Sequence, residues 1–292
     1  MLAKISAKFE RIKKLILSLE ERNRLREDQV VGQKLLSAEY NRIPVGEFQN
    51  FRDVGWGLYS QHDEDGILLY IFSRIGIKTH RAVEMCAGDG IECNVANLIL
   101  NHRWTALLVD GNSDNIEVAR AFYKSRPETR HWGPDIKQAW LTRDNVNQLL
   151  SDAGYVGEVD LLSLDVDGND YWLWQALTVI EPRVVVLEYN HLHGPYVSVS
   201  VPYRDNFVAE FSKYGSDYAG ASLAAFIKLG RSKGYRYVGS NTIGTNAFFV
   251  RDDISTDLLP EADPLQAFSH PRAKFGMEVR FKAIKDKEWV EV

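Results

Sequence analysis

Residues 81–112, RAVEMCAGDGIECNVANLILNHRWTALLVDGN, decide the fold of this chain. The first apolar run, residues 82–86, is short and predicts a buried strand. Apolar residues with helical spacing follow at 91–100, and a second short apolar run at 105–109 predicts another buried strand. A strand, a turn, a helix and a second strand in this order predict a βαβ unit.

A glycine turn and a carboxylate mark the ends of these two strands. Gly88 and Gly90 flank Asp89 after the first strand, and glycine allows positive φ and close approach to a ligand. Asp110 follows the second strand, 22 residues after Gly88, where an acid typically binds ribose hydroxyls. A dinucleotide fingerprint would have a third glycine where this chain has Cys93. The pattern predicts an adenosine-containing cofactor, and a plain βαβ unit with a tight turn is the alternative.

The rest of the chain continues to alternate helices and strands. Helices are predicted at residues 115–124, 145–150, 171–177 and 223–233. Strands are predicted at residues 136–141, 159–164, 184–187, 235–238 and 246–250. The alternation predicts a parallel α/β sheet, and the last two strands are close enough to pair as an antiparallel hairpin. This combination is similar to the Rossmann-like, seven-stranded sheet of class I methyltransferases.

The first 42 residues differ from the rest of the chain and predict a long amphipathic helix. Its apolar residues follow a heptad pattern: Leu2, Ile5, Phe9, Ile12, Ile16 and Leu19. Such a helix packs on its own domain or on a second copy in a homo-oligomer, and its lysines and arginines also suit peripheral membrane contact. We therefore expect three parts: a helix at 1–42, a catalytic domain at 43–253 and a C-terminal extension at 254–292.

Composition limits the classes of function. The chain has 292 residues, 45% of them hydrophobic, and a net charge of −5, which disfavours nucleic-acid binding. No apolar run is long enough to span a membrane, and the N-terminus lacks the features of a signal peptide. The two cysteines, Cys86 and Cys93, flank the glycine turn and suit packing better than a disulfide or metal site. We expect a reducing, cytoplasmic location.

Carboxylates follow the fourth and fifth predicted strands. Asp165 and Asp167 come directly after one strand, and Glu188 follows the other. Because parallel strands end at the same edge of a sheet, these oxygens can converge, and oxygen ligands suit Mg²⁺ or Mn²⁺. The sequence therefore predicts a divalent-metal site. Alternatively, Asp165 contacts the cofactor, Asp167 caps the next helix and Glu188 pairs with Arg183.

Two histidines in the following loop are candidates for a general base. His191 and His193 lie just beyond Glu188, and imidazole titrates near neutral pH. A lone histidine in a loop is more often simply exposed. Further upstream, Ser60 and Asp63 predict the start of a helix whose first turn lies over the cofactor or is only solvated.

Six segments carry a resemblance to a known family. They are SQHDEDGIL (60–68), VEMCAGDGIECN (83–94), DLLSLDVDGNDYWLW (160–174), PRVVVLEYN (182–190), YAGASLAAF (218–226) and GYRYVGSNTIGTNAFFV (234–250). Together they resemble the FkbM-type methyltransferases that depend on S-adenosylmethionine (SAM), over about two-thirds of the chain. The resemblance implies O-methylation of a sugar or polyketide hydroxyl. The chain is also similar to sugar O-methyltransferases that use a divalent ion after the fourth and fifth strands.

The resemblance implies roles for individual residues. Glu84 would orient the glycine turn or receive the methionine ammonium group, and Asp110 would bind the ribose. The cofactor contacts expected are Gln61, Glu84, Gly88, Asp89, Gly90, Asp110, Gly111, Asn112, Leu141 and Asp165. The residues expected to hold the metal are Asp165, Asp167 and Glu188, with Asn190 nearby, and those expected in catalysis are Asp165, His191 and His193.

The sequence therefore favours a SAM-dependent O-methyltransferase that acts on a sugar or glycan hydroxyl, with possible help from a divalent ion. A metal-dependent glycosyltransferase is the first alternative, because Asp165-Val166-Asp167 is a DxD motif. The second alternative is a non-catalytic module that keeps the fold and interacts through its N-terminal helix.

Overall fold

The computed structural model describes residues 26–292, without the side chains of residues 215 and 216. The chain divides into two compact units, Met1–Ile43 and Pro44–Val292. In the first unit, residues 26–40 form a helix, and the predicted heptad pattern at residues 2–19 lies outside the described residues. Among the helices that the structure describes, none has both the length and the apolar character needed to cross a membrane.

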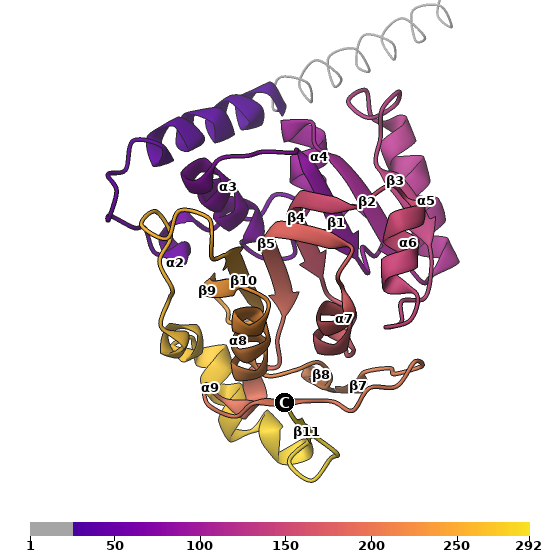
Figure 1. Ribbon diagram of the computed structural model, residues 1–292, viewed down its shortest axis with the longest axis vertical. Helices are drawn as coiled ribbons and strands as arrows, with labels where there is room; N and C mark the ends of the chain where they lie inside the picture. Colours follow the sequence, from indigo (N-terminus) through magenta and orange to yellow (C-terminus); the bar gives the residue numbers. More distant parts are fainter. Residues whose placement is uncertain (1–25) are drawn as a thin grey trace, which may run out of the picture. The chain divides into compact units, whose positions relative to one another are not determined.

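The second unit is built around a seven-stranded sheet with the order β3-β2-β1-β4-β5-β10-β9 (Figure 1). Its strands are β1 (Arg81–Met85), β2 (Thr105–Asp110), β3 (Asp135–Gln138), β4 (Gly157–Leu164), β5 (Ile180–Glu188), β9 (Tyr235–Ser240) and β10 (Asn246–Arg251). Strands β1 to β5 pair in parallel, whereas β10 is antiparallel to both of its neighbours. This is the Rossmann-like class I methyltransferase sheet, and it confirms the predicted fold.

Helices connect the strands, and side-chain caps start several of them. They are α2 (Phe51–Val54), α3 (Glu64–Ile75), α4 (Ala96–His102), α5 (Ser113–Ser125), α6 (Val146–Asp152), α7 (Asp170–Ala176), α8 (Leu223–Ser232) and α9 (Pro271–Glu278). The Asn112 side chain accepts the Asp114 N–H at 2.8 Å, which starts α5, and Ser222 caps α8 in the same way. Helix α4 begins at Ala96, later than the predicted residue 91, because residues 91–95 form turns instead.

Large aromatic side chains fill the core between the sheet and its helices. Trp174 of α7 is almost fully buried and packs against Phe249 of β10 with ring centroids 5.2 Å apart. Phe226 of α8 lies on another side of the same indole, at 6.3 Å. Buried aromatic rings of this size contribute a large share of the apolar burial that stabilises a domain. They fix α7 and α8 against β10.

The long connection after β5 and the C-terminal segment fold together. Residues 191–218 contain the turn η1 (His191–His193) and the strands β6 (Val199–Ser200), β7 (Glu210–Ser212) and β8 (Gly215–Tyr218). The C-terminal segment contains η2 (Pro264–Phe268), α9, η3 (Arg280–Ala283) and β11 (Val290–Glu291). Strand β11 pairs with β6, and the β7–β8 hairpin and α9 lie together at the lower end of Figure 1. Residues 254–292 thus belong to the same compact unit as the sheet.

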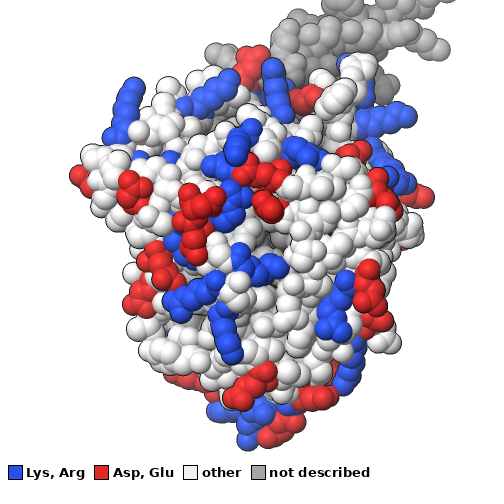
Figure 2. Space-filling model, viewed as in Figure 1, with Lys and Arg blue, Asp and Glu red and all other residues white. Residues whose placement is uncertain are grey.

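The surface carries charges of both signs. On the face shown in Figure 2, basic and acidic side chains of the described residues are interspersed. Mixed surfaces of this kind keep a protein hydrated without creating a large field of one sign.

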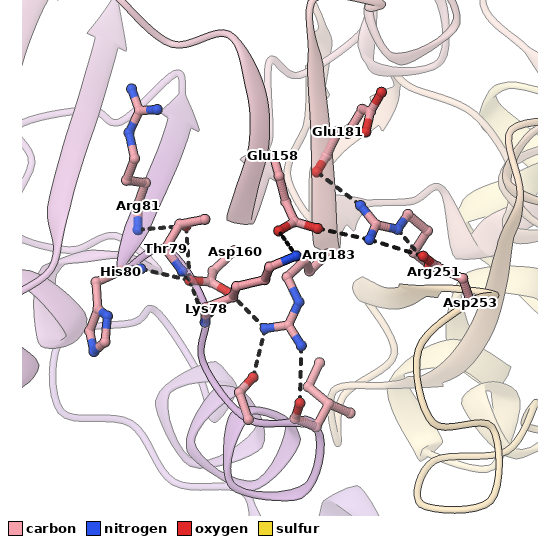
Figure 3. A network of polar contacts seen from close by, with 12 residues as sticks. Lys78, Thr79, His80, Arg81, Glu158, Asp160, Glu181, Arg183, Arg251 and Asp253 are labelled. Atoms are coloured by element: carbon pink, nitrogen blue, oxygen red, sulfur yellow. Dashed lines mark hydrogen bonds and ion pairs between the residues drawn. The ribbon is translucent and has the colours of Figure 1, made fainter.

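A buried polar network holds the sheet near the amino ends of β4 and β5 (Figure 3). The Asp160 carboxylate, which has no exposed surface, accepts the backbone N–H groups of Lys78, Thr79 and His80. Its other strong partner is the Arg183 guanidinium at 2.7 Å, which also donates to two carbonyl groups at the end of α3. A buried ion pair of this kind is held in place by its hydrogen bonds, and losing one partner is costly. The network links α3, β4, β5 and the segment before β1.

We expect Asp160→Asn to reduce the free energy of unfolding by about 3–5 kcal/mol, because Arg183 would stay buried without its counter-charge. Burial opposes ionisation of Asp160, but hydrogen bonds from Arg183 and the backbone outweigh it and lower the pKa of this carboxyl. A lowered folded-state pKa stabilises the fold above the unfolded-state pKa, and this stabilisation is lost as pH falls through the folded-state value.

Urea unfolding measures this effect at neutral and acidic pH. The control is Asp253→Asn, which removes the exposed partner of Arg251 and should cost less than about 1 kcal/mol. Equal losses in the two variants would contradict the importance assigned to the buried network.

Candidate active site

The glycine turn lies at the carboxyl end of β1, as predicted. Gly88 and Gly90 have φ values of +54° and +68°, in the left-handed region that favours glycine. A Cβ atom on Gly90 would lie 3.2 Å from the side chains of Ala119 and Leu108, so this residue also allows close packing against α5 and β2. The sequence therefore identified the turn correctly.

Asp110 connects the end of β2 to this turn. Its carboxylate accepts the N–H of Gly88 at 2.9 Å, the N–H of Asn112 at 2.8 Å and the amide of Asn115 at 3.3 Å. The side chain is 5% exposed, so its orientation is fixed before any ligand arrives. A carboxylate can accept about four hydrogen bonds, and three are already made. About one position is therefore left for a ligand, and a second becomes available if the long bond from Asn115 breaks.

Glu84 holds the segment that follows the turn in place. Its carboxylate accepts the N–H groups of Asn94 and Val95 and the hydroxyl of Ser163, at 3.2, 2.8 and 2.9 Å. These bonds satisfy the free N–H groups in front of α4 and explain why the helix starts late. Burial raises the pKa of Glu84 to about 7 in spite of these bonds. The geometry supports its role in orienting the turn.

A cavity of about 220 Å³ opens between the ends of β2, β3 and β4, and we call it the β2–β4 cavity. Asp110 and Gly111 line it after β2, Trp140 and Leu141 after β3, and Asp167 after β4. The indole N–H of Trp140 donates to a backbone carbonyl at 2.6 Å, which fixes the ring at the cavity wall. A carboxylate beside an aromatic face suits adenosine, because the ribose donates hydrogen bonds and the base stacks.

The predicted cofactor residues fall into three groups. Those lining the β2–β4 cavity are Asp110, Gly111 and Leu141. Those lining a second cavity, described below, are Gln61 and Asp165. Those that build the turn and the helix starts around it, without lining either cavity, are Glu84, Gly88, Asp89, Gly90 and Asn112.

The three predicted metal ligands converge. One carboxylate oxygen each from Asp165, Asp167 and Glu188 lies within 4.8 Å of the others. Leu164 of β4 is paired in register with Leu187 of β5, which places Asp165 beside Glu188 at the ends of adjacent strands. Convergent carboxylates of this kind are the ligand type that Mg²⁺ and Mn²⁺ prefer.

The electrostatics of this carboxylate cluster are strained. Burial, and then the negative charges of Asp170 and Asp167, raise the pKa of Asp165 to about 8. Burial, and then the charge of Asp165, raise the pKa of Glu188 well above its usual value. Like charges held this close favour protonation of one member unless a cation neutralises them.

Asp170 fixes the loop that presents the cluster. It accepts the N–H groups of Val166 and Gly168 at 2.7 and 2.9 Å, and the loop holds Asp167 at a φ of +51°. The alternative pairing of Glu188 with Arg183 is wrong, because Arg183 pairs with Asp160, nearer the amino end of β5.

A second cavity of about 320 Å³, the β4–β5 cavity, contains this cluster. Its lining combines the three carboxylates and Gln61 with Arg272 and Arg280 from the C-terminal segment. Asp167 and Phe211 line both this cavity and the β2–β4 cavity. The two cavities therefore meet at Asp167 and Phe211. A further cavity of about 530 Å³ lies beside β9 and shares no lining residue with either.

The two histidines are poor candidates for a base. His191 lines the β4–β5 cavity, but burial and the nearby charges of Arg280 and Arg272 lower its pKa to about 3. His193 packs against the ring of Trp289 at 4.1 Å and does not line the cavity, and burial lowers its pKa to about 4. A base with so low a pKa accepts a proton weakly at neutral pH.

Several lining residues were not predicted from the sequence. They are Trp140, Phe207, Phe211, Arg272 and Arg280. Trp140 lies inside the strand predicted at residues 136–141, but the observed β3 ends at Gln138, so Trp140 belongs to the strand end. The other residues come from long connections without a recognisable pattern. Glu64 and Asp65, in the first turn of α3, are buried and accept hydrogen bonds from neighbouring loops.

Comparison with solved structures finds matches at low similarity. WbdD has a TM-score of 0.37 and 14% identity over 59% of this chain, which spans only 36% of WbdD. Magnesium protoporphyrin IX methyltransferase from Synechocystis PCC 6803, with bound SAM, has a TM-score of 0.41 and 12% identity over 64% of this chain and 77% of its own. The N-terminal domain of EvdMO1, with S-adenosylhomocysteine (SAH) and D-fucose, has a TM-score of 0.42 and 13% identity over 74% and 94%.

No family model and no curated protein matches the sequence. The class of the protein is therefore defined by its own strand order, which is that of the class I methyltransferase fold. The FkbM-type resemblance stays a hypothesis about the family.

We expect Asp110→Asn to weaken binding of SAM or SAH about tenfold or more, because one charge-assisted hydrogen bond contributes about 1.5–3 kcal/mol. The substitution keeps the size of the side chain, and isothermal titration calorimetry with SAH measures it. Asn115→Ala is the matched control, because it removes only the longest bond to Asp110. An unchanged dissociation constant in Asp110→Asn would rule out ribose binding by this carboxylate.

Proposed function

We propose that this protein is a SAM-dependent O-methyltransferase, with SAM in the β2–β4 cavity and a hydroxyl-bearing acceptor in the β4–β5 cavity. The observation that carries the proposal is that the two cavities share Asp167 and Phe211 at their junction. A methyl donor and an acceptor must meet in such an arrangement, because transfer requires the acceptor oxygen in line with the sulfonium. SAM, when bound, supplies the electrophilic methyl group.

Some residues of the chain would position SAM, and others would act on the acceptor hydroxyl. Asp110 and Trp140 would hold the adenosine part, and the hydrogen bonds that Glu84 accepts fix the segment beside the turn. Asp165, in the ionised form that a bound cation would favour, would accept a hydrogen bond from the acceptor hydroxyl. The Phe211 side chain, which lines both cavities, would help to exclude water from the junction.

The carboxylate cluster fits a divalent ion such as Mg²⁺ or Mn²⁺. Its oxygens lie within 4.8 Å of one another, and burial together with mutual repulsion raises the pKa of Asp165 and of Glu188. Asp165, Asp167 and Glu188 would hold the ion. Bound there, it would lower the pKa of an acceptor hydroxyl and fix its oxygen.

The finer parts of the proposal concern substrate and setting. The FkbM-type resemblance favours a sugar or glycan acceptor, and the two free cysteines agree with a reducing, cytoplasmic location. EvdMO1 was solved with D-fucose, which agrees with this class of acceptor without identifying it. A glycosyltransferase is the second candidate for Asp165 and Asp167, and a calorimetric titration with SAM separates the two.

Methyl transfer to a surrogate glycan should be lost in EDTA and restored by Mg²⁺ or Mn²⁺. Asp165→Asn and Glu188→Gln should each lower turnover far more than SAH affinity, because they disturb the acceptor side and leave Asp110 intact. Mn²⁺ binding by calorimetry gives an independent readout, and Asp252→Asn, an exposed residue away from both cavities, is the control. Full activity in EDTA would leave a metal-free mechanism in place of this one.

Self-association through the N-terminal helix also stays a proposal. Removing residues 1–40 should lower the molar mass measured by light scattering. A monomeric full-length chain would instead favour packing of the helix on its own domain or on a membrane surface.

A further inference from the structure

Helix α9 brings an arginine into the wall of the β4–β5 cavity. The helix approaches the η1 turn closely at Gly276, where a Cβ atom would lie 2.7 Å from His191 and Leu192 side-chain atoms. This close packing places Arg272, in the first turn of α9, in the same cavity lining as the carboxylate cluster. The C-terminal segment therefore contributes directly to the acceptor side of the site.

The two arginines of this wall differ in their partners. Arg280 is neutralised by Asp217, with Nη2 at 2.6 Å and Nε at 2.7 Å from one carboxylate oxygen, and both side chains are buried. Arg272 has no ion pair or side-chain hydrogen bond within residues 26–292, although its backbone N–H is bonded to His270. Arg272 thus presents to the cavity a positive charge that no ion pair in the described residues neutralises.

An unpaired guanidinium in this setting is unfavourable. Arg272 is half-buried, and burial together with the charge of Arg280 lowers its pKa. A cation removed from water needs a counter-charge or hydrogen-bond acceptors to offset its desolvation. Glu188 attracts it electrostatically but forms no ion pair with it in the described part of the chain.

The cavity is therefore polar in two ways. The carboxylates Asp165, Asp167 and Glu188 gather in one group, and the guanidinium of Arg272 is the free basic group of the same lining, as far as residues 26–292 show. Its volume of about 320 Å³ is small for a ligand site, where about 300–1,000 Å³ is typical. One molecule can then reach both groups, with a hydroxyl at the carboxylates and an acceptor of hydrogen bonds at Arg272.

We propose that the acceptor is an anionic hydroxyl compound, such as a uronic acid or a sugar phosphate unit, and that Arg272 binds its carboxylate or phosphate group. A guanidinium suits either group, because its planar fork forms paired hydrogen bonds with both. The inference rests on the proposed function, since it assigns this cavity to the acceptor.

Three matched ligands test this inference: methyl glucoside, methyl glucuronide and methyl glucoside 6-phosphate. They share one ring and differ at C6, where they carry a hydroxymethyl group, a carboxylate or a phosphate ester. Binding is measured by calorimetry or ligand-observed NMR, with Mg²⁺ present and with and without SAH. The galactose series is measured in parallel, so that ring stereochemistry does not decide the result.

The variant is Arg272→Gln, with Arg272→Lys to retain charge without the planar fork. Arg231→Gln is the control, because Arg231, which lies on α8, forms an exposed ion pair with Glu261. We expect an anionic ligand to bind the wild type at least about tenfold tighter than its neutral counterpart, a preference that Arg272→Gln reduces to less than about threefold. The control should keep the preference, and Arg272→Lys should keep part of it. Whether the carboxylate or the phosphate binds more tightly identifies the anionic group.

An equal affinity for neutral and anionic ligands, an unchanged preference in Arg272→Gln, or no binding of any ligand would overturn the inference. Thermal unfolding and SAH affinity, both expected to be unchanged, show whether the variant is folded. Loss of the proposed function is a separate result: it would appear as a failure of the wild type to bind SAH, while the preference for anionic ligands is still measured without SAH.

Discussion

Repulsion among carboxylates is the constraint around which the functional end of this molecule is built. Parallel pairing of β4 with β5 forces Asp165 and Glu188 to neighbouring positions, and the loop fixed by Asp170 adds Asp167. Such a cluster is unfavourable by itself, because each charge disfavours ionisation of the others. A fold that keeps it gains a place where a cation or a polar ligand is strongly favoured.

The two ends of the sheet differ in whether their charged side chains are neutralised by one another. Near the amino ends of the strands, Asp160 and Arg183 neutralise one another, and backbone groups satisfy their remaining hydrogen-bonding positions (Figure 3). At the carboxyl ends, the carboxylates lie against one another, and Arg272 forms no ion pair in the described part of the chain. The first arrangement stabilises the sheet, whereas the second leaves interaction energy for a ligand.

Much of the fold followed from short-range patterns. The glycine turn, Asp110 and the apolar strands were predictable because their backbone and burial requirements restrict the residue types. Convergence of Asp165, Asp167 and Glu188 was predictable because parallel strands end at one edge. The start of α4 was not predictable, since it depends on hydrogen bonds that Glu84 of β1 accepts from the residues before the helix.

The wall of the β4–β5 cavity that contains Arg272 and Arg280 could not be predicted from the sequence for a similar reason. Arg272 and Arg280 lie more than 80 residues beyond Glu188, in a segment without periodicity, and reach the cavity only through close packing of α9 at Gly276. The low basicity of His191 was equally hidden, because burial and these same arginines produce it. Long-range packing therefore decided the parts of the site that local pattern could not reach.

The most direct measurement is a crystal structure of the protein grown with SAH and Mn²⁺, with anomalous scattering recorded to locate the metal. The account predicts SAH in the β2–β4 cavity, with its ribose at Asp110 and its base beside Trp140. It also predicts an anomalous peak bonded to Asp165, Asp167 and Glu188. SAH bound elsewhere, or a carboxylate cluster without an anomalous peak, would contradict it.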